Sequence, residues 1–168
     1  AFGSAKIMVP LVTTVEEVRN VKALVEGIKE DLRKEGIAFD EGIEVGCMME
    51  TAASTMIADL LAKEADFFSI GTNDLTGYTM AADRGNGDVS YLYSPFQPSV
   101  LRMIRRIIKN ARENNIPVGI GAILKGLAVH GSEDLVTHSR EQRPVIYEAL
   151  AVQAGERQLT EGVGLVRG

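Results

Sequence analysis

The 168-residue sequence contains one cysteine, Cys47, and no tryptophan. A single cysteine excludes an internal disulfide framework and a cysteine-based zinc site. Aromatic residues make up 5% of the chain, so a core has to be built mainly from aliphatic side chains. No apolar, uncharged run reaches the ~18 residues of a membrane span, which excludes a helical membrane protein. No signal-peptide pattern opens the chain, and we expect a cytoplasmic protein.

Positive charge is also scarce, with 18 Lys and Arg against 23 Asp and Glu and a net charge of −5. This balance argues against nucleic-acid binding and against a polybasic membrane-surface protein. One segment does carry a basic stripe, which a solvated outer helix face explains better than nucleic-acid binding: Arg102, Arg105, Arg106, Lys109 and Arg112. Hydrophobic residues at 45% and charged residues at 24% are typical of a single globular domain.

Segments with the apolar pattern of buried strands alternate along the chain with segments that have the apolar spacing of amphipathic helices. Buried-type strands are predicted at 6–12, 43–49, 67–70 and 116–120. Amphipathic helices are predicted at 15–35, 53–61 and 99–111. The first has a Thr14–Glu17 capping box and is expected to end at Gly36, and the last is expected to be capped by Ser99. An irregular stretch is expected at 72–98. This order predicts an α/β fold with a parallel sheet covered by helices, and both a βα-barrel and a doubly wound sheet fit it.

Two carboxylates, Glu50 and Asp74, directly follow successive predicted strands. Ligand sites gather at the carboxyl ends of parallel strands, and paired carboxylates there could hold Mg²⁺; two solvated carboxylates are the alternative. The turn-rich segment that contains Asn73 could hold a phosphate or carboxylate with its amide and backbone donors. Arg84 could bind an anion bidentately, with an ordinary surface arginine as the alternative.

The run ETAASTMIADLLAKEADFFSIGTNDLTGYTMAADRGN, Glu50 to Asn86, carries a family signature. It closely resembles the phosphoenolpyruvate-binding domain of enzyme I of the bacterial phosphotransferase system. SIGTNDL followed by DRGN at this spacing is highly specific, and pyruvate phosphate dikinase and phosphoenolpyruvate synthase share a looser version. KIMVPLVTTVEEVR, IEVGCMMET and YLYSPFQPSVLRMIRRII also resemble the family, so the likeness extends over residues 6–120.

The resemblance implies part of a (βα)₈ TIM barrel that binds phosphoenolpyruvate through Mg²⁺ or Mn²⁺. By their places in the motif, Glu50 and Asp74 would be the metal ligands, Asn73 would contact the phosphate and Arg84 would clamp it. Metal and arginine would then neutralise an anion whose phosphoryl group leaves as charge shifts to the enolate.

Departures from the family pattern limit what the resemblance implies. Gly121 occupies the position of the family's proton-donating cysteine, and the likeness ends near that residue. We therefore expect a partial barrel domain at 1–121 and a divergent, partly helical tail at 122–168. The family's early barrel strands and its domain with a phosphorylated histidine have no counterpart here. The chain is thus expected to be a fragment or relative of enzyme I that binds phosphoenolpyruvate without performing full phosphotransfer alone.

Other interpretations stay open at this stage. A metal ion held by two carboxylates could serve a hydrolase, lyase or aldolase that acts on a small anionic or carbonyl substrate. The chain could also be a non-catalytic, self-associating remnant. Cys47 lies among apolar residues and is predicted to be a buried, inert thiol. His130 and His138 are predicted to be surface residues. Because four strands cannot close an eight-stranded barrel, we expect a homodimer.

Overall fold

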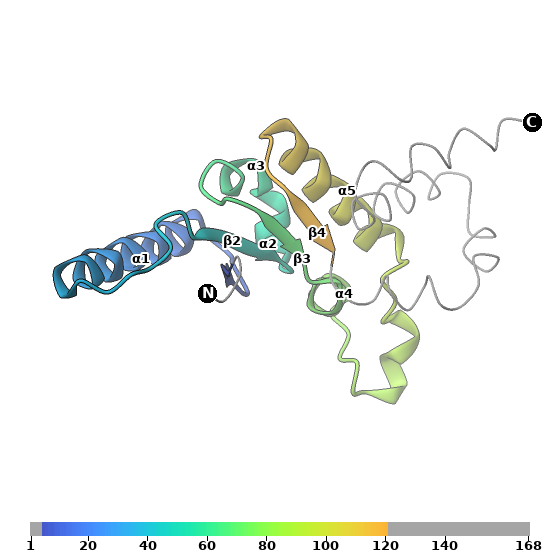
Figure 1. Ribbon diagram of the computed structural model, residues 1–168. Coiled ribbons are helices and arrows are strands. Elements are labelled where there is room, and N and C mark those ends of the chain that lie inside the picture. The colour runs from blue at the N-terminus through green and yellow to red at the C-terminus, as the bar shows by residue number, and fades with distance from the viewer. Residues whose placement is uncertain (1–4, 121–168) are drawn as a thin grey trace, which may run out of the picture.

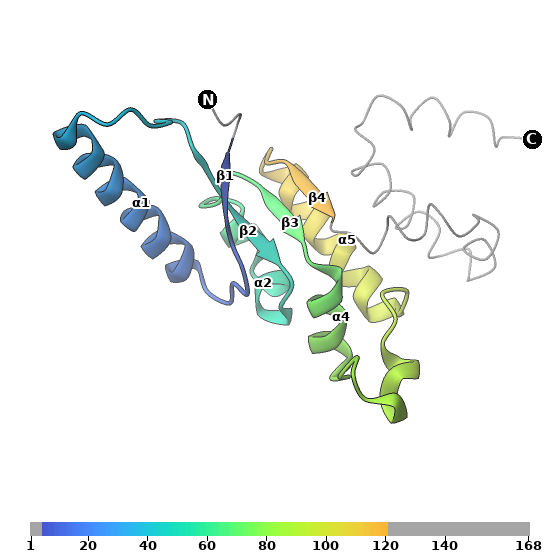
Figure 2. The same cartoon turned by 60° about the horizontal axis from the view of Figure 1, so that its bottom comes forward.

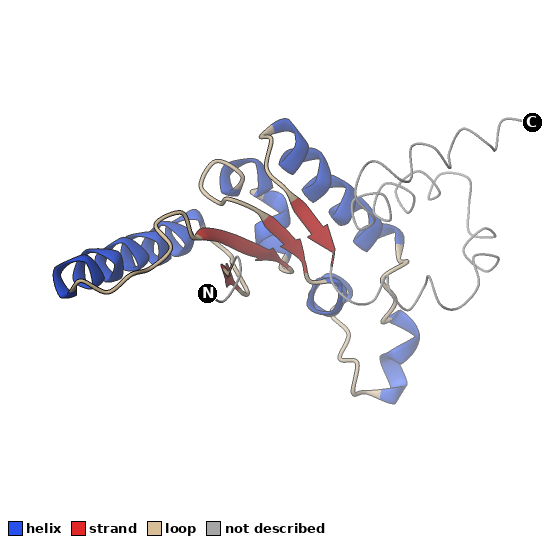
Figure 3. Cartoon of the chain, viewed as in Figure 1, coloured by secondary structure: helices blue, strands red, loops and turns tan. Residues whose placement is uncertain are grey.

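The computed structural model describes residues 5–120 as a four-stranded parallel sheet with helices (Figure 1). The strands lie side by side in chain order and are all parallel, as the arrows of β2, β3 and β4 show (Figure 3). Their bounds are β1 Lys6–Val9, β2 Glu44–Met49, β3 Phe68–Ile70 and β4 Val118–Ile120. The predicted α/β class with parallel strands is confirmed.

The strands are joined by five α-helices and one 3-10 helix among the described residues: α1 Val15–Glu35, α2 Ala52–Met56, α3 Ala58–Leu61, α4 Thr72–Met80, η1 Gly87–Leu92 and α5 Pro98–Glu113. Helices α2, α3 and α5 cover one face of the sheet, while α1 projects beyond it (Figure 2). Helix α4 lies at the ends of the strand arrows rather than over a face. Coverage of a single face is consistent with a segment of a barrel, since a doubly wound sheet carries helices on both faces.

The longest helix, α1, begins and ends at the residues that its sequence predicts. The Thr14 hydroxyl accepts from the Glu17 N–H, and the Glu17 carboxylate accepts from the Thr14 N–H at 2.8 Å, which completes the capping box. The Thr13 and Thr14 N–H groups both donate to this carboxylate and lower the pKa of Glu17. Gly36 ends the helix with φ 69°, a left-handed conformation in which glycine carries no Cβ penalty.

The core lies between the covered face of the sheet and the helices. Alternate residues of β2 and β3, Met49, Phe68 and Ile70 among them, point toward α3 and α5. Helix α5 supplies the largest helical share of this core, with side chains at helical spacing: Val100, Leu101, Ile104, Ile107, Ile108 and Ala111. Removal of this mainly aliphatic surface from water is the main gain from the packing.

The opposite face of the sheet is polar at one end. Lys6 of β1 pairs with Glu44 of β2, and its ammonium lies 5.1 Å from the centre of the Phe67 ring. The Phe67 ring fills the space above Gly46, where a Cβ would lie 2.5 Å from the ring carbons. Among residues 5–120, no helix covers this face.

The predicted irregular stretch at 72–98 is wrong, because it contains α4 and η1. Local sequence argues against a helix at 72–80, since Thr72, Thr76 and Gly77 are weak helix formers. Tertiary burial decides in favour of the helix: Leu75 and Thr76 are fully buried, and Thr72 is nearly so. The Thr76 hydroxyl also donates to the Thr72 carbonyl at 2.7 Å, so it leaves no unsatisfied group.

Several predicted element boundaries also shift. The first strand ends at Val9 rather than residue 12, because Pro10 has no N–H for the ladder. The predicted helix at 53–61 is two short helices that meet at Ile57, whose ψ of 22° is not helical. The N-cap of α5 is Gln97 with Pro98 at the first helical position, so the expected cap at Ser99 is wrong.

Two predictions lie outside the described residues: the replacement of a cysteine by Gly121, and the partly helical tail at 122–168. The two histidines also lie there. Over residues 5–120, no helix is both long enough and apolar enough to cross a bilayer.

Candidate functional site

Parallel strands bring their carboxyl ends to one edge of the sheet, and the predicted site residues lie along that edge. Glu50 follows β2 directly, and α4 begins at Thr72, two residues after β3 ends at Ile70. Because Met49 and Ile70 are partners in the β2–β3 register, the residues that follow them start from neighbouring points. The sheet therefore places Glu50 beside the first turn of α4, which carries Asn73 and Asp74.

Glu50 is a buried carboxylate, 3% exposed, with its orientation fixed by the chain after β1. Its Oε1 accepts from the Leu11 N–H at 2.8 Å. Leu11 adopts φ 51°, a left-handed conformation that is costly for a leucine. The strained backbone at Leu11 is what aims this N–H at Glu50.

A second bond joins the same two segments. The Thr51 hydroxyl donates to the Val12 carbonyl at 2.7 Å, and it also accepts from the Ser54 N–H at 2.9 Å as the N-cap of α2. The consecutive residues Glu50 and Thr51 thus form hydrogen bonds to another consecutive pair, Leu11 and Val12. The loop after β1 and the loop after β2 are held as one unit behind the Glu50 carboxylate.

The other side of Glu50 is pressed against Gly71, the N-cap of α4. A Cβ built on Gly71 would clash with Oε2 of Glu50 and lie 2.9 Å from its Cβ, so only glycine fits here. The φ of Gly71 is −86°, so close approach rather than backbone conformation requires the glycine. Sequence reasoning missed Gly71, because its role depends on the alignment of β2 with β3.

Asp74 lies near enough to Glu50 to act on its ionisation. Burial raises the pKa of Glu50 above its usual range, the Leu11 N–H lowers it, and the charge of Asp74 together with a side-chain hydrogen bond to it raises it further. No lysine or arginine among residues 5–120 forms an ion pair with either carboxylate. The structure therefore brings together the two residues that the sequence predicts as a pair.

This pair suits a hard divalent cation. Carboxylate oxygens are the ligands that Mg²⁺ and Mn²⁺ prefer, and a cation would relieve the repulsion between Glu50 and Asp74. Within the described part of the chain, no group of three or more His, Cys, Asp or Glu side chains is placed to hold a metal. Two protein ligands would leave the remaining positions to water and to a bound anion, as is usual for Mg²⁺.

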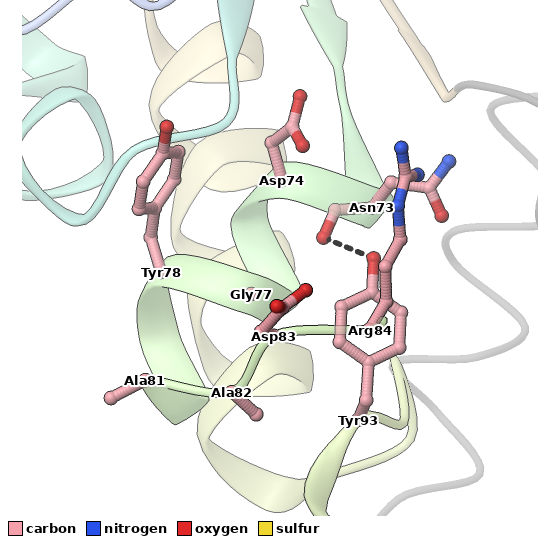
Figure 4. Close-up of a pocket in the computed structure, with 9 residues that line it drawn as sticks. All are labelled: Asn73, Asp74, Gly77, Tyr78, Ala81, Ala82, Asp83, Arg84 and Tyr93. Carbon is pink, nitrogen blue, oxygen red and sulfur yellow. Dashed lines mark hydrogen bonds between the residues drawn. The ribbon is translucent and has the colours of Figure 1, made fainter. Parts of the chain in front are cut away.

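A pocket of about 490 Å³ opens beside Asp74 (Figure 4). Its lining comes from the first turn of α4, the end of that helix, the loop that follows and the residue after η1: Asn73, Asp74, Gly77, Tyr78, Ala81, Ala82, Asp83, Arg84 and Tyr93. Three of the four predicted site residues line it. Glu50 is not among the lining residues, and Asp74 connects it to the pocket.

Arg84 is exposed, and within residues 5–120 it forms no ion pair. The loop that carries it is shaped by its neighbours, since the Asp83 carboxylate accepts from the Gly85 N–H at 2.8 Å. Figure 4 shows the guanidinium of Arg84 on the same side of the pocket as the Asn73 amide. An anion in the pocket would therefore meet an amide donor and a guanidinium fork.

Other side chains considered from the sequence are accounted for by structure. Cys47 is fully buried, and burial raises its pKa to about 12, so its thiol is inert. Within the basic stripe, Arg106 donates to the Thr55 and Met56 carbonyls at 3.0 and 2.9 Å, and so ties α5 to α2. All five residues of the stripe are exposed, so the predicted solvated outer face is confirmed, and Arg106 in addition bonds to α2.

Fold and site together define an α/β domain that gathers two carboxylates, an amide and an arginine at the carboxyl edge of a parallel sheet. The family described as "PEP-utilising enzyme, PEP-binding domain" matches residues 1–127. The chain belongs to this family. The resemblance identified from the motifs in 6–120 is thereby confirmed.

Curated relatives carry the name phosphoenolpyruvate-protein phosphotransferase. The protein of Haemophilus influenzae is 54% identical over 108 residues, which are 64% of this chain and 19% of the relative. That of Priestia megaterium is 50% identical over 125 residues, 74% of this chain and 22% of the relative. That of Streptococcus equinus is 49% identical over 124 residues, with the same shares. The chain thus spans about one fifth of the length of these relatives, as a fragment or relative of enzyme I.

Proposed function

We propose that this chain binds phosphoenolpyruvate with the help of Mg²⁺ or Mn²⁺. Glu50 and Asp74 hold the cation, Asn73 contacts the phosphate and Arg84 clamps it. The observation that carries the proposal is the placement of the buried Glu50 beside Asp74, which in turn lines a pocket with Asn73 and Arg84. The name of the matched family and the names of the relatives support the same ligand.

Each part of the proposed site contributes a different interaction to ligand binding. A bound divalent cation would offset the negative charge of the phosphate and polarise it. Arg84 adds a second, fixed positive charge at the pocket, and Asn73 supplies an uncharged donor. Leu11, Thr51 and Gly71 keep the Glu50 carboxylate in place before any ligand arrives. We propose that this chain alone binds the ligand and does not perform full phosphotransfer. We also propose a domain at residues 1–121, a tail at 122–168 and a cytoplasmic location.

The proposal is tested by calorimetric titration of phosphoenolpyruvate in the presence and absence of Mg²⁺. Arg84→Ala should weaken binding about 10- to 100-fold, because a hydrogen bond to a charged group contributes about 1.5–3 kcal/mol. Arg102→Ala is the matched control, since Arg102 is an exposed arginine on α5 away from the pocket. A phosphoenolpyruvate affinity that does not depend on Mg²⁺, or that is equal in the two variants, would contradict the proposed site.

We also propose that the chain forms a homodimer that covers its exposed apolar surface. Large apolar side chains remain exposed on α1 and near β1 in the described residues: Met8, Leu11, Leu24 and Ile28. One face of the sheet is also bare of helices there. Burial of such surface is favourable, and a twofold pair is the simplest closed assembly. Light scattering over a dilution series should report twice the chain mass; a monomer at every concentration that binds no hydrophobic dye would refute the dimer.

A further inference from the structure

Tyr93, which follows η1, forms a long-range hydrogen bond to the first turn of α4. Its phenol O–H donates to the Asn73 carbonyl at 2.8 Å, across 20 residues of sequence (Figure 4). A carbonyl oxygen has two lone pairs, and the α-helical ladder uses one of them. The Tyr93 bond therefore adds to the helix without competing with it.

The Tyr93 ring also lies beside α4. A Cβ placed on Gly77 would be in ordinary contact with Cε2 of Tyr93, at 3.6 Å, so the ring faces Gly77. Asn73 and Gly77 are four residues apart and lie on the same face of the helix. The hydroxyl and the ring thus engage one face of α4, at the face that also lines the pocket.

The loop between α4 and Tyr93 is fastened at both ends. At its start, Ala81 ends α4 with φ 49°, and its N–H donates to the Gly77 carbonyl. At its end, η1 is organised by the Asn86 side chain, which accepts from the Asp88 N–H at 3.0 Å, and Tyr93 follows η1. Arg84 lies between these two anchor points.

We propose that Tyr93 is a positioning residue of the anion site. It holds the loop of residues 81–92 against α4, so that Arg84 lines the same pocket as Asn73 and Asp74. The inference rests on the proposed function for the identity of the anion, but the anchoring of the loop is independent of any ligand. In this role Tyr93, which also lines the pocket, acts through the placement of Arg84.

The first test is limited trypsin cleavage of the ligand-free chain, with mass spectrometry used to follow the Arg84–Gly85 bond. Tyr93→Phe keeps the ring on Gly77 and removes only the hydroxyl, so cleavage at this bond should accelerate about 2- to 12-fold, as expected for loss of one hydrogen bond. Tyr91→Phe is the matched control, because Tyr91 lies two residues earlier and is 75% exposed. Its cleavage rate should equal that of the parent chain.

The second test measures phosphoenolpyruvate affinity in Mg²⁺ for the same variants. Tyr93→Phe should weaken binding about 2- to 12-fold by loss of one hydrogen bond, while Tyr91→Phe should not. In an Arg84→Ala background, Tyr93→Phe should change affinity by less than about twofold, because a residue that acts through Arg84 has no further effect without it. A residue with only a general structural role would give additive losses.

The outcomes separate this inference from the proposed function. Unchanged cleavage in Tyr93→Phe, or additive losses in the double variant, overturns the positioning role of Tyr93. A parent chain that binds no phosphoenolpyruvate overturns the proposed function, and the cleavage comparison still decides whether Tyr93 anchors the loop. Faster cleavage together with non-additive affinity losses supports both.

Discussion

The double variant Glu50→Gln, Asp74→Asn is expected to lose detectable Mn²⁺ binding. Each amide keeps the shape of the carboxyl group but removes the negative charge that a hard cation requires. Loss of one charged ligand should weaken binding about 10- to 100-fold, and loss of both should take it below detection. Electron paramagnetic resonance of free Mn²⁺ measures this directly.

The control for this double variant changes charge by the same amount elsewhere. Asp31→Asn with Glu35→Gln removes two negative charges from exposed positions on α1, and it should bind Mn²⁺ as the parent chain does. Equal affinity in the parent chain and in the Glu50, Asp74 variant would eliminate this pair as the metal site.

The single variant Glu50→Gln should also gain stability in the metal-free chain. The pKa of Glu50 is raised by burial and by Asp74, so the folded state binds its proton more tightly than the unfolded state does. Above that raised pKa, the charged form therefore lowers stability. A glutamine can still accept from Leu11 and can donate to Asp74. Its thermal midpoint should exceed that of the parent at neutral pH, and the difference should shrink as pH falls through the raised pKa of Glu50 and vanish below the pKa of the unfolded state.

The second large effect is expected from Gly71→Ala, which adds one methyl group and changes no charge. The new Cβ would lie 2.9 Å from Glu50 Cβ and closer still to Oε2, so the carboxylate has to move. Overpacking of this kind costs about 1–3 kcal/mol, and the displaced carboxylate can no longer share a cation with Asp74. Denaturant melts and Mn²⁺ titration should both show the loss.

Gly87→Ala is the matched control for this substitution. A Cβ on Gly87 would meet no atom within 4 Å, and the φ of Gly87 is not positive, so alanine should leave stability and metal binding near the parent values. If Gly71→Ala bound Mn²⁺ as tightly as Gly87→Ala, the close approach of Gly71 to Glu50 would have no part in the site.

Sequence patterns were sufficient where local chemistry decides the structure. The Thr14–Glu17 capping box and the left-handed Gly36 depend on residues a few positions apart, and both appear as predicted. The apolar spacing on α5 likewise predicts its buried face. Glu50 and Asp74 could be paired in advance, because parallel strands bring their carboxyl ends to one edge whatever their exact register.

Contacts between distant segments could not be predicted in this way. Helix α4 forms from weak helix formers because Leu75 and Thr76 become buried, and burial is a property of the fold. The fit of Gly71 against Glu50 follows from the partnership of Met49 with Ile70. The Tyr93 bond to Asn73 requires the intervening loop to return to α4, which no periodicity encodes.

The strand order has a consequence for how the chain acquires its structure. Each strand pairs only with its neighbours along the chain, so β1–β2 pairing requires no residue beyond Met49, and β2–β3 pairing requires none beyond Ile70. Each parallel pairing still closes a long crossover, such as the one from Lys6 to Glu44, so loop-closure entropy is lost at every step and slows folding. On a ribosome, which adds about 5–20 residues per second, the sheet can grow strand by strand because each strand pairs with one that precedes it in the chain. The Glu50 carboxylate and its Leu11 donor would meet in the first of these steps, well before Arg84 is synthesised.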